Sequence, residues 1–386
     1  MYRLFALFAF LFLAGHGARA AAVDAALQPP PVIAAPGAQY GPATRPFQGI
    51  PGIERAPGGR LWATWYGGGP DEGPENYVML STSADDGRTW SGVKLVIDPP
   101  GPIRAYDPCL WLAPDGRLWL FWAQAHTWWD GRAGVWAITT RNPDAETPAW
   151  SSPRRLCDGI MMNKPTVLST GEWVLPAAIW KVSTERITDP AARHDPGDDT
   201  GTNLVVSTDR GATWTRRGQA RVPERTFDEA MLVERKDSSL WLWVRTKYGI
   251  GESISTDHGR TWSPGKPSTI PHINARFYVR RLKSGRLLLA RHDPPEGSTR
   301  RSHLKAYLSD DDGKTWKGGL LLDERVGVSY PDAAQAPDGT VYLIYDFDRK
   351  GARQILLTTF TEEDVLAAKP VSGKLRSRVV VNQASG

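Results

Sequence analysis

The apolar and polar positions of this chain repeat one pattern six times: an apolar segment, a tight polar turn and a second apolar segment. Apolar segments joined in this way are typical of β-hairpins. The turn positions 59, 116, 171, 239, 285 and 339 are separated by 57, 55, 68, 46 and 54 residues. That period fits four short strands with their loops. The pattern therefore predicts an all-β fold, a six-bladed β-propeller of four-stranded antiparallel blades.

The longest interval contains a polar insertion from Thr184 to Asn203 that is rich in Asp, Arg, Pro and Gly. Such a composition is typical of a loop rather than a strand. We expect this insertion to form a surface loop over the third blade.

An eight-residue phrase recurs with Ser first, Asp third, Gly fifth, Thr seventh and Trp eighth. Its four copies are Ser83–Trp90, Ser207–Trp214, Ser255–Trp262 and Ser309–Trp316. The Asp carboxylate accepts backbone N–H groups of a turn, Gly supplies a positive φ, and Trp covers the hairpin. The phrase is expected between the third and fourth strands of blades one, three, four and five. A decayed copy runs from Thr139 to Trp150 in blade two, and blade six has none. We interpret the phrase as structural, not catalytic.

The first 20 residues have the three parts of a secretory signal peptide. Arg3 precedes an apolar run from Leu4 to Ala14, and Ala18-Arg19-Ala20 forms a small-x-small cleavage site. The run is too short to span a bilayer comfortably, and no later segment approaches about 18 unbroken apolar residues. We expect a secreted or periplasmic protein without a membrane span.

The repeats indicate one domain after the signal peptide. Residues 21–44 are expected to form an N-terminal extension and residues 45–386 the propeller. Residues 27–45 and 372–382 are expected to supply strands that close the ring. Cys109 and Cys157 are assigned to different repeat units, and export permits a disulfide between them, so the sequence leaves their pairing open.

The charge distribution and the missing metal-binding motifs limit which ligands this chain is expected to bind. It contains 47 Lys and Arg residues against 42 Asp and Glu residues, a formal net charge of +5. The basic residues are scattered, whereas a nucleic-acid interface needs a patch or stripe, so we expect no nucleic-acid partner. No His-x-x-x-His, Cys-x-x-Cys or regular calcium-loop spacing occurs, and we expect neither a metal nor a cofactor. No pattern indicates the oligomeric state.

Polar residues of both signs are predicted to gather at one mouth of the propeller. In each blade the first strand begins, the second ends and the third begins on the same face. Loops on a rigid scaffold usually carry function, which makes this mouth the expected site for a polar ligand. Simple structural ion pairs among Glu229, Arg245 and Asp346 are the alternative. The residues placed at this mouth are Asp71, Arg104, Asp107, Glu229, Arg245, Arg301, Tyr330 and Asp346.

Several of these segments resemble the sialidase superfamily in its BNR, or Asp-box, form, and the resemblance covers almost the whole chain after the signal. Asp228 to Arg245 is similar to the segment with the Glu partner of the nucleophile and a carboxylate-binding arginine. Arg301 to Leu308 is similar to the segment with another such arginine, and Ser329 to Ala333 to the strand with the nucleophilic tyrosine. Asp71 to Glu75 resembles the acid/base loop, and Arg104 to Cys109 a segment bordering the glycan pocket.

The resemblance implies a retaining exo-glycosidase that releases a terminal acidic sugar, such as sialic acid, from a glycan. A neutral tyrosine nucleophile suits a sugar whose own carboxylate lies beside the anomeric carbon. Tyr330 would attack, Glu229 would accept the phenolic proton, and Asp71 would act as acid/base. Arg245 and Arg301 would bind the substrate carboxylate, while Arg104 and Asp107 would border the glycan.

The sequence departs from the family at the motif Phe-Arg-Ile-Pro, the source of the first carboxylate-binding arginine. This chain has Gln48-Gly49-Ile50-Pro51, with Gly49 in the arginine position. The substrate therefore stays open, and Arg45 or Arg104 is an alternative source of the missing charge.

Other assignments stay open as well. Glu75 is an alternative acid, His126 to Asp130 is an alternative sugar-stacking wall or hairpin cap, and Asn163-Lys164 is a further possible ligand contact. A glycan-binding propeller without catalysis, or a hydrolase or lyase acting on glycans capped with uronic acid, are the alternative functions.

Overall fold

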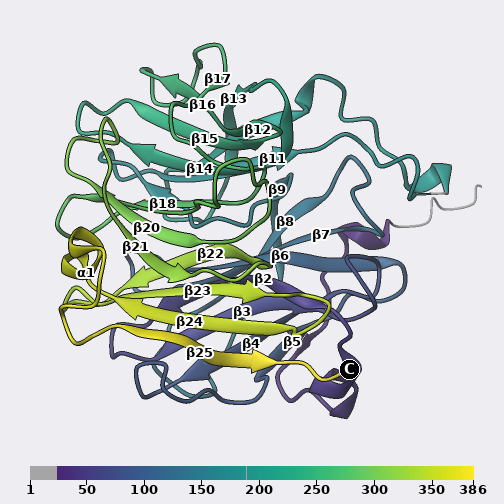
Figure 1. The fold of residues 1–386 in the computed structure, drawn as a ribbon. Coiled ribbons are helices and arrows are strands. Elements are labelled where there is room, and N and C mark those ends of the chain that lie inside the picture. The colour runs from purple at the N-terminus through teal and green to yellow at the C-terminus, as the bar shows by residue number, and fades with distance from the viewer. Residues whose placement is uncertain (1–23, 188) are drawn as a thin grey trace, which may run out of the picture.

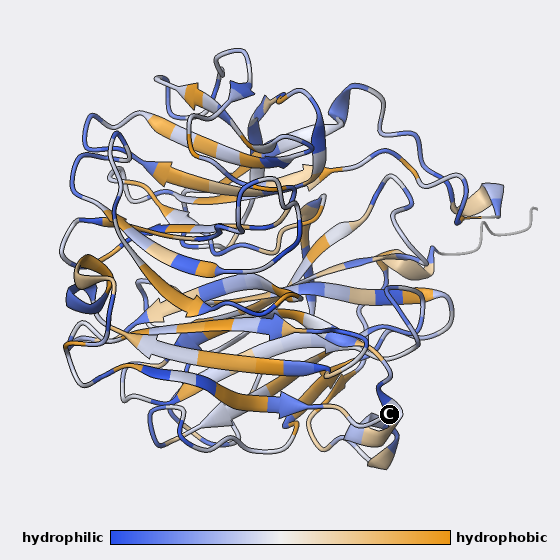
Figure 2. Ribbon diagram, in the orientation of Figure 1, coloured by the Kyte–Doolittle hydropathy of each residue, from blue (hydrophilic) through white to orange (hydrophobic). Residues whose placement is uncertain are grey.

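A computed structural model describes residues 24–187 and 189–386 as a ring of six antiparallel sheets, so the predicted fold class is confirmed (Figure 1). The six sheets follow one another along the chain, and each begins with its innermost strand. Hydrophobic residues concentrate in the strands and hydrophilic residues in the connections (Figure 2). The predicted signal peptide, residues 1–20, lies outside the described residues.

Blade one contains β2 (Gln48–Arg55), β3 (Leu61–Gly67), β4 (Tyr77–Ser83) and β5 (Leu95–Ile97), and blade two contains β6 (Ile103–Leu112), β7 (Leu118–His126), β8 (Gly134–Thr140) and β9 (Arg154–Asp158). Blade three contains β10 (Thr166–Val167), β11 (Trp173–Ile179), β12 (Gly201–Ser207) and β13 (Thr215–Ala220), and blade four contains β14 (Arg225–Glu234), β15 (Leu240–Thr246), β16 (Gly249–Ser255) and β17 (Lys266–Pro267). Blade five contains β18 (Tyr278–Arg281), β19 (Leu287–His292), β20 (Leu304–Ser309) and β21 (Lys317–Asp323), and blade six contains β22 (Val328–Gln335), β23 (Val341–Phe347), β24 (Gln354–Phe360) and β25 (Arg376–Gln383).

Short helices occur outside the sheets. The 3-10 turns are η1 (Ala25–Leu27), η2 (Ala38–Tyr40), η3 (Pro42–Thr44), η4 (Pro190–Ala192) and η5 (Gly197–Asp199), and the α-helix is α1 (Glu362–Ala367). Helix α1 joins β24 to β25, where blade six lacks the repeated phrase. Turns η4 and η5 lie in the long connection between β11 and β12, on the opposite side of the molecule from α1 (Figure 1).

The ring closes without a strand shared between the two ends of the chain, which corrects the expectation of closing strands. The segment β1 (Val32–Ile33) pairs with β5 and widens blade one at its outer edge, while β25 is the outer strand of blade six. Two buried hydrogen bonds join β2 of blade one to the two inner strands of blade six, β23 and β22. The Ile50 N–H donates to Asp346 Oδ2 at 2.8 Å, and the Ile53 N–H donates to Asp332 Oδ2 at 2.9 Å.

Each copy of the repeated phrase lies between the third and fourth strands of its blade, as predicted. In blade three the Ser207 hydroxyl donates to Asp209 Oδ1 at 2.8 Å and accepts the Gly211 N–H at 2.7 Å. The Thr213 hydroxyl and N–H both donate to the Asp209 carboxylate, at 2.6 and 2.8 Å. These bonds, led by that of the Thr213 hydroxyl, lower the pKa of Asp209 to about 2.

The two cysteines lie in the same blade, which corrects their assignment to different repeat units. Cys109 is on the innermost strand β6 and Cys157 on the outermost strand β9, and both are free. Two strands separate them, because β7 and β8 lie between β6 and β9 in the sheet. In the described part of the chain, no helix has the length and apolar character needed to cross a membrane.

Candidate active site

Four innermost strands bend at the same mouth of the ring. In β2, β6, β14 and β22 the pairing register shifts, and a residue other than glycine adopts a positive φ. A bulge of this kind turns a side chain out of the regular alternation of the strand, at a cost in backbone strain. The residues concerned are Ile50 (φ 56°), Asp107 (48°), Tyr330 (54°) and, in β14, the three consecutive residues Phe227 (58°), Asp228 (49°) and Glu229 (47°).

Three of the predicted residues form one hydrogen-bonded group at this mouth. The Tyr330 hydroxyl donates to Glu229 Oε1 at 3.1 Å, and Arg245 Nη1 donates to the same oxygen at 2.6 Å. Arg245 Nη1 also lies 3.4 Å from the Tyr330 hydroxyl, and its Nε donates to Asn274 Oδ1 at 2.7 Å. Burial, followed by the Glu229 charge, raises the pKa of Tyr330 to about 12. The phenol is therefore protonated at neutral pH and has a carboxylate in contact that can accept its proton.

This group opens into a cavity of about 160 Å³. Arg301 enters it from the β19–β20 connection, donates to Ser329 Oγ at 2.8 Å and places its Cζ 5.4 Å from the centre of the Tyr330 ring. Arg301 pairs with no carboxylate among the described residues, which leaves a cation beside the phenol. The cavity is lined by Tyr66, Glu72, Arg104, Tyr106, Asp107, Trp129, Met162, Trp180, Phe227, Glu229, Arg245, Arg301, Tyr330 and Arg349.

Arg104 and Asp107 lie in the cavity wall formed by β6. The Arg104 guanidinium stacks on the Tyr106 ring, with 3.8 Å from its Cζ to the ring centre. Burial raises the pKa of Asp107 to about 8; Arg104 opposes this shift, while Glu72 and Glu229 add to it. Asp107 is therefore largely uncharged at neutral pH and can donate a hydrogen bond into the cavity.

The predicted acid/base residue lies outside the cavity lining. Asp71, in the β3–β4 connection, is half exposed, and its carboxylate pairs with Lys350 Nζ at 2.5 Å. The alternative acid, Glu75, is exposed and also outside the lining. Their neighbour Glu72 does line the cavity, where Oε1 accepts a hydrogen bond from Arg349 Nη1 at 2.8 Å. The β3–β4 connection thus supplies a carboxylate to the cavity, although from one residue further along the chain.

The sequence analysis did not find Arg349. This residue lies three positions after Asp346, in the connection from β23 to β24, and lines the same cavity as Arg301. Burial works against its charge, but its neighbours, including Asp346 and Glu72, raise its pKa above the usual value, so it is a cation. The available signal was positional: in the predicted register, a residue just beyond Asp346 belongs to the same mouth.

Arg45, one alternative source of the charge missing at Gly49, is used elsewhere. It is fully buried, and it donates to the Tyr40 carbonyl at 2.7 Å and to Asn382 Oδ1 at 2.8 Å. Arg45 therefore ties the N-terminal extension to β25 and is absent from the cavity lining.

Aromatic side chains form the outer wall of the cavity. The Phe227 ring lies 5.4 Å from that of Trp129 and 5.3 Å from that of Trp180, measured between ring centres. Trp128, next to them, is covered by Arg186 of the long β11–β12 connection, whose Cζ lies 3.6 Å from the ring centre. The insertion therefore braces this wall, and Trp129 joins the cavity as the sugar-stacking alternative requires.

Asn163 and Lys164 support the architecture. Asn163 Nδ2 donates to the carbonyls of Glu229 and Ala230 at 2.8 and 2.9 Å, and these hydrogen bonds stabilise the bulge of β14. Lys164 Nζ donates to the Leu110 carbonyl at 2.7 Å and pairs with Asp332 at 3.3 Å, and both side chains of this pair are buried.

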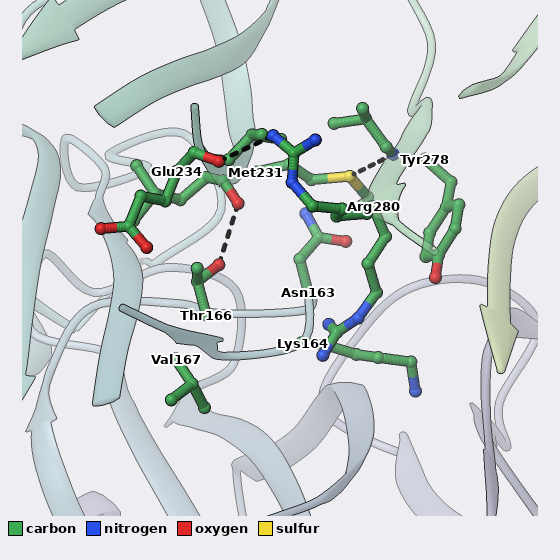
Figure 3. Close-up of a pocket in the computed structure, with 12 residues that line it drawn as sticks. Asn163, Lys164, Thr166, Val167, Met231, Glu234, Tyr278 and Arg280 are labelled. Atoms are coloured by element: carbon green, nitrogen blue, oxygen red, sulfur yellow. Dashed lines mark hydrogen bonds between the residues drawn. The ribbon is translucent and has the colours of Figure 1, made fainter. Parts of the chain in front are cut away.

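A second cavity, of about 260 Å³, lies between β10, β14 and β18 (Figure 3). Backbone segments and their hydrogen bonds form much of its wall: Thr166 donates to the Leu232 carbonyl, and the Val279 N–H points at the Met231 sulfur. It contains no tyrosine–carboxylate contact like that of Tyr330 and Glu229. Within residues 24–187 and 189–386, no cluster of three or more His, Cys, Asp or Glu side chains could hold a metal.

Comparison with known proteins agrees with this architecture. The model of the BNR repeat-like domain family matches residues 59–343. A sialidase of Bacteroides fragilis is 22% identical over 300 residues, covering 70% of this chain and 54% of that protein. The anhydrosialidase of Macrobdella decora is 28% identical over 162 residues, 37% of this chain and 21% of that protein. The chain thus matches about half or less of the length of these relatives.

Solved structures share the fold at low sequence identity. The Hadza microbial sialidase Hz136 superposes with a TM-score of 0.63 at 20% identity, covering 83% of this chain and 67% of that one. The intramolecular trans-sialidase of Ruminococcus gnavus gives a TM-score of 0.63 at 15% identity, with 85% and 97% covered. The match to the family model over most of the propeller, with the six blades and their Asp boxes, shows that the chain belongs to the BNR repeat-like family of the sialidase superfamily.

Proposed function

We propose that this protein is a retaining exo-glycosidase that releases a terminal acidic sugar of the sialic acid type from glycans. The observation that carries the proposal is the contact of Tyr330 with Glu229 and Arg245 inside the cavity, at 3.1 and 3.4 Å from the phenolic oxygen. A phenol that is held against a carboxylate and surrounded by arginines fits a nucleophile for an anionic sugar.

In the first step, the Tyr330 oxygen attacks the anomeric carbon while the bond from that carbon to the leaving oxygen breaks. The phenolic proton passes to Glu229, and an acid on the β3–β4 connection protonates the leaving oxygen. In the second step, water attacks the anomeric carbon and gives a proton to the same acid/base residue. The tyrosyl bond breaks, and the phenolate recovers its proton from Glu229. In sum, one glycoside and one water give the free acidic sugar and the hydroxyl form of the leaving group, and the enzyme groups return to their starting protonation states.

Charge in the cavity suits a substrate carboxylate. Arg245 and Arg301 flank Tyr330, and paired N–H groups of a guanidinium match the two oxygens of a carboxylate. Asp107, which also lines the cavity, is largely neutral at pH 7, so it adds little repulsion toward an anionic sugar and can bind one of its hydroxyl groups. The sialidase names of the relatives support the same substrate class.

Two carboxylic acids on the β3–β4 connection are candidates for the acid/base role. Asp71 is the residue predicted from the sequence, and it reaches the cavity only if the connection moves and its pair with Lys350 opens. Glu72 already lines the cavity. Export, as predicted from residues 1–20, would bring the protein to glycans outside the cytoplasm.

A covalent trap tests the nucleophile. We expect a fluorinated sialosyl fluoride to label Tyr330, detected as an adduct on its peptide by mass spectrometry. Tyr330→Phe should take up no label and should lose aryl α-sialoside hydrolysis by about a thousandfold or more. Tyr278→Phe is a matched control, because Tyr278 lines the second cavity, between β10, β14 and β18, and donates to the Ala333 carbonyl. Unchanged hydrolysis by Tyr330→Phe would refute the assignment.

Leaving-group dependence tests the acid. An aryl leaving group needs little protonation, whereas the sugar leaving group of sialyllactose needs a general acid. The acid variant, Asp71→Asn or Glu72→Gln, should therefore lose far more activity on sialyllactose than on the aryl sialoside. Binding of sialosides without hydrolysis of either substrate would favour a glycan-binding propeller without catalysis. Cleavage confined to uronic-acid-capped glycans would favour a hydrolase or lyase acting on those glycans.

A further inference from the structure

Arg349 enters the active-site cavity from blade six and faces the nucleophile. Its Cζ lies 5.3 Å from the centre of the Tyr330 ring, almost the same distance as that of Arg301, at 5.4 Å. With Arg245 at the phenolic oxygen, three guanidinium groups surround one tyrosine. Glu229 and Glu72 each bind one of these arginines, whereas Arg301 pairs with no carboxylate among the described residues.

The absence of a side chain at position 49 makes room for Arg349. A Cβ atom on Gly49 would lie 2.4 Å from Cδ and 2.6 Å from Cγ of Arg349, and 2.8 Å from Asp346 Oδ2. Contacts below 3 Å between carbon atoms are strongly repulsive, because the well of the dispersion interaction lies near 3.5–4.0 Å. The stem of Arg349 therefore occupies the volume where a side chain at position 49 would begin.

We propose that Arg349 binds the carboxylate of the substrate together with Arg245 and Arg301, and so supplies from blade six the cation that position 49 lacks. The inference rests on the proposed function, because it names a further binding residue of the same site. Glu72 Oε1 accepts a hydrogen bond from the Arg349 guanidinium at 2.8 Å. A substrate carboxylate would compete for, or share, the N–H groups of that guanidinium.

Carboxylate discrimination is the readout that tests this role. The ligands are 2,3-dehydro-2-deoxy-N-acetylneuraminic acid and its methyl ester, compared by calorimetric titration. We expect the wild type to prefer the acid and Arg349→Ala to reduce that preference by about tenfold, the size of one charge-assisted hydrogen-bonded contact. Arg349→Lys should keep part of the preference, because an ammonium retains the charge but not the planar pair of donors.

Moving the arginine gives a second, independent test. Gly49→Arg alone places two stems in one volume and should weaken binding of the acid. The double variant Gly49→Arg with Arg349→Ala removes the clash with the Arg349 stem and leaves only the 2.8 Å approach to Asp346 Oδ2, which a small rotation of that carboxylate relieves. It should recover the preference that Arg349→Ala loses. Arg378→Ala is the matched control, because Arg378 is on the outer strand β25 and pairs with Glu324 on the molecular surface. It should leave the preference unchanged.

The outcomes separate this inference from the proposed function. If the wild type prefers the acid and Arg349→Ala, shown to be folded by its circular dichroism, keeps the full preference, the inference fails while the proposed function stands. If the wild type neither binds nor cleaves a sialic acid derivative, the proposed function fails. The comparison is then made with glucuronic acid and glucuronamide, and absence of a carboxylate preference there also overturns the inference.

Discussion

The two faces of this propeller use the same strands in opposite ways. On the Asp-box face, two consecutive residues of each box have positive φ, a residue other than glycine and then the glycine, as in Arg210 (φ 55°) and Gly211 (φ 81°), and the polar side chains of the box satisfy the turn. On the opposite face, Asp107, Glu229 and Tyr330 have positive φ inside strand bulges, and their side chains line the cavity. In the boxes the strained turn is held by its own local hydrogen bonds, whereas the strain at the cavity persists only because packing between strands enforces it. The difference separates what defines the scaffold from what defines the site.

Electrostatics divides the faces in the same way. Asp209 of an Asp box is stabilised as an anion by hydrogen bonds, and its pKa falls to about 2. Asp107 of the cavity is destabilised as an anion by burial, and its pKa rises to about 8. Two aspartates of one fold therefore titrate on opposite sides of the usual value, because one faces donors and the other a desolvated pocket.

The largest expected contrast comes from replacing one paired glutamate on each face by glutamine. Glu229 pairs with Arg245 at the cavity, and Glu172 pairs with Arg217 on the Asp-box face. Glu229→Gln should lower kcat for an aryl α-sialoside by about 10²- to 10⁴-fold, because the phenolic proton loses its acceptor. Glu172→Gln should leave kcat within about twofold, as expected of a residue remote from the chemistry. A similar loss in both variants would mean that Glu229 acts through stability.

The pH dependence of stability should have opposite signs on the two faces. Because the pKa of Asp107 is raised in the folded state, its contribution is complete below its unfolded pKa, near 4, and is lost as the pH rises through about 8. The contribution of Asp209 is present above that unfolded pKa and is lost as the pH falls through about 2.

Urea unfolding of the wild type and of Asp107→Asn and Asp209→Asn measures both trends. The free energy of unfolding of the wild type, relative to Asp107→Asn, should decrease between about pH 4 and pH 8. Relative to Asp209→Asn it should decrease only on acidification. A difference from Asp107→Asn that is flat across this range would show that the Asp107 carboxyl is not shifted.

A smaller effect is expected from the Asp box itself. Ser207 is buried, and its hydroxyl links Asp209 to the Gly211 N–H. Ser207→Ala leaves that N–H without its acceptor and should cost about 1–3 kcal/mol of unfolding free energy. The kcat for the aryl sialoside should not change, and Ser152→Ala, an exposed serine, is the control for stability. A loss of activity at full stability would contradict a structural role for the boxes.

The contrast between the faces also explains what the sequence could predict. Repeats such as Ser207–Trp214 recur because every blade needs the same turn, so the pattern located the strands without structural help. Glu229, Arg245 and Tyr330 were found because the register and the family resemblance agree. Arg349 was missed since its role depends on Gly49, which is about 300 residues away along the chain, and no local pattern records that juxtaposition. The position of β1 was also predicted wrongly, because a strand of two residues is too short to show a periodic pattern in the sequence.

The smallest expected effect lies at the rim of the site. Phe227 is 38% exposed, next to Trp129 and Trp180 on the strained bulge of β14. Phe227→Ala should raise KM for sialyllactose by about two- to tenfold, the worth of one aromatic contact, with little change in kcat. Leu321→Ala, at an equally exposed apolar position on β21, is the control. A fall in kcat at constant KM would instead show that Phe227 sets the geometry of Arg245, whose Cζ lies 5.5 Å from the ring centre, so that the rim and the catalytic group act as one unit.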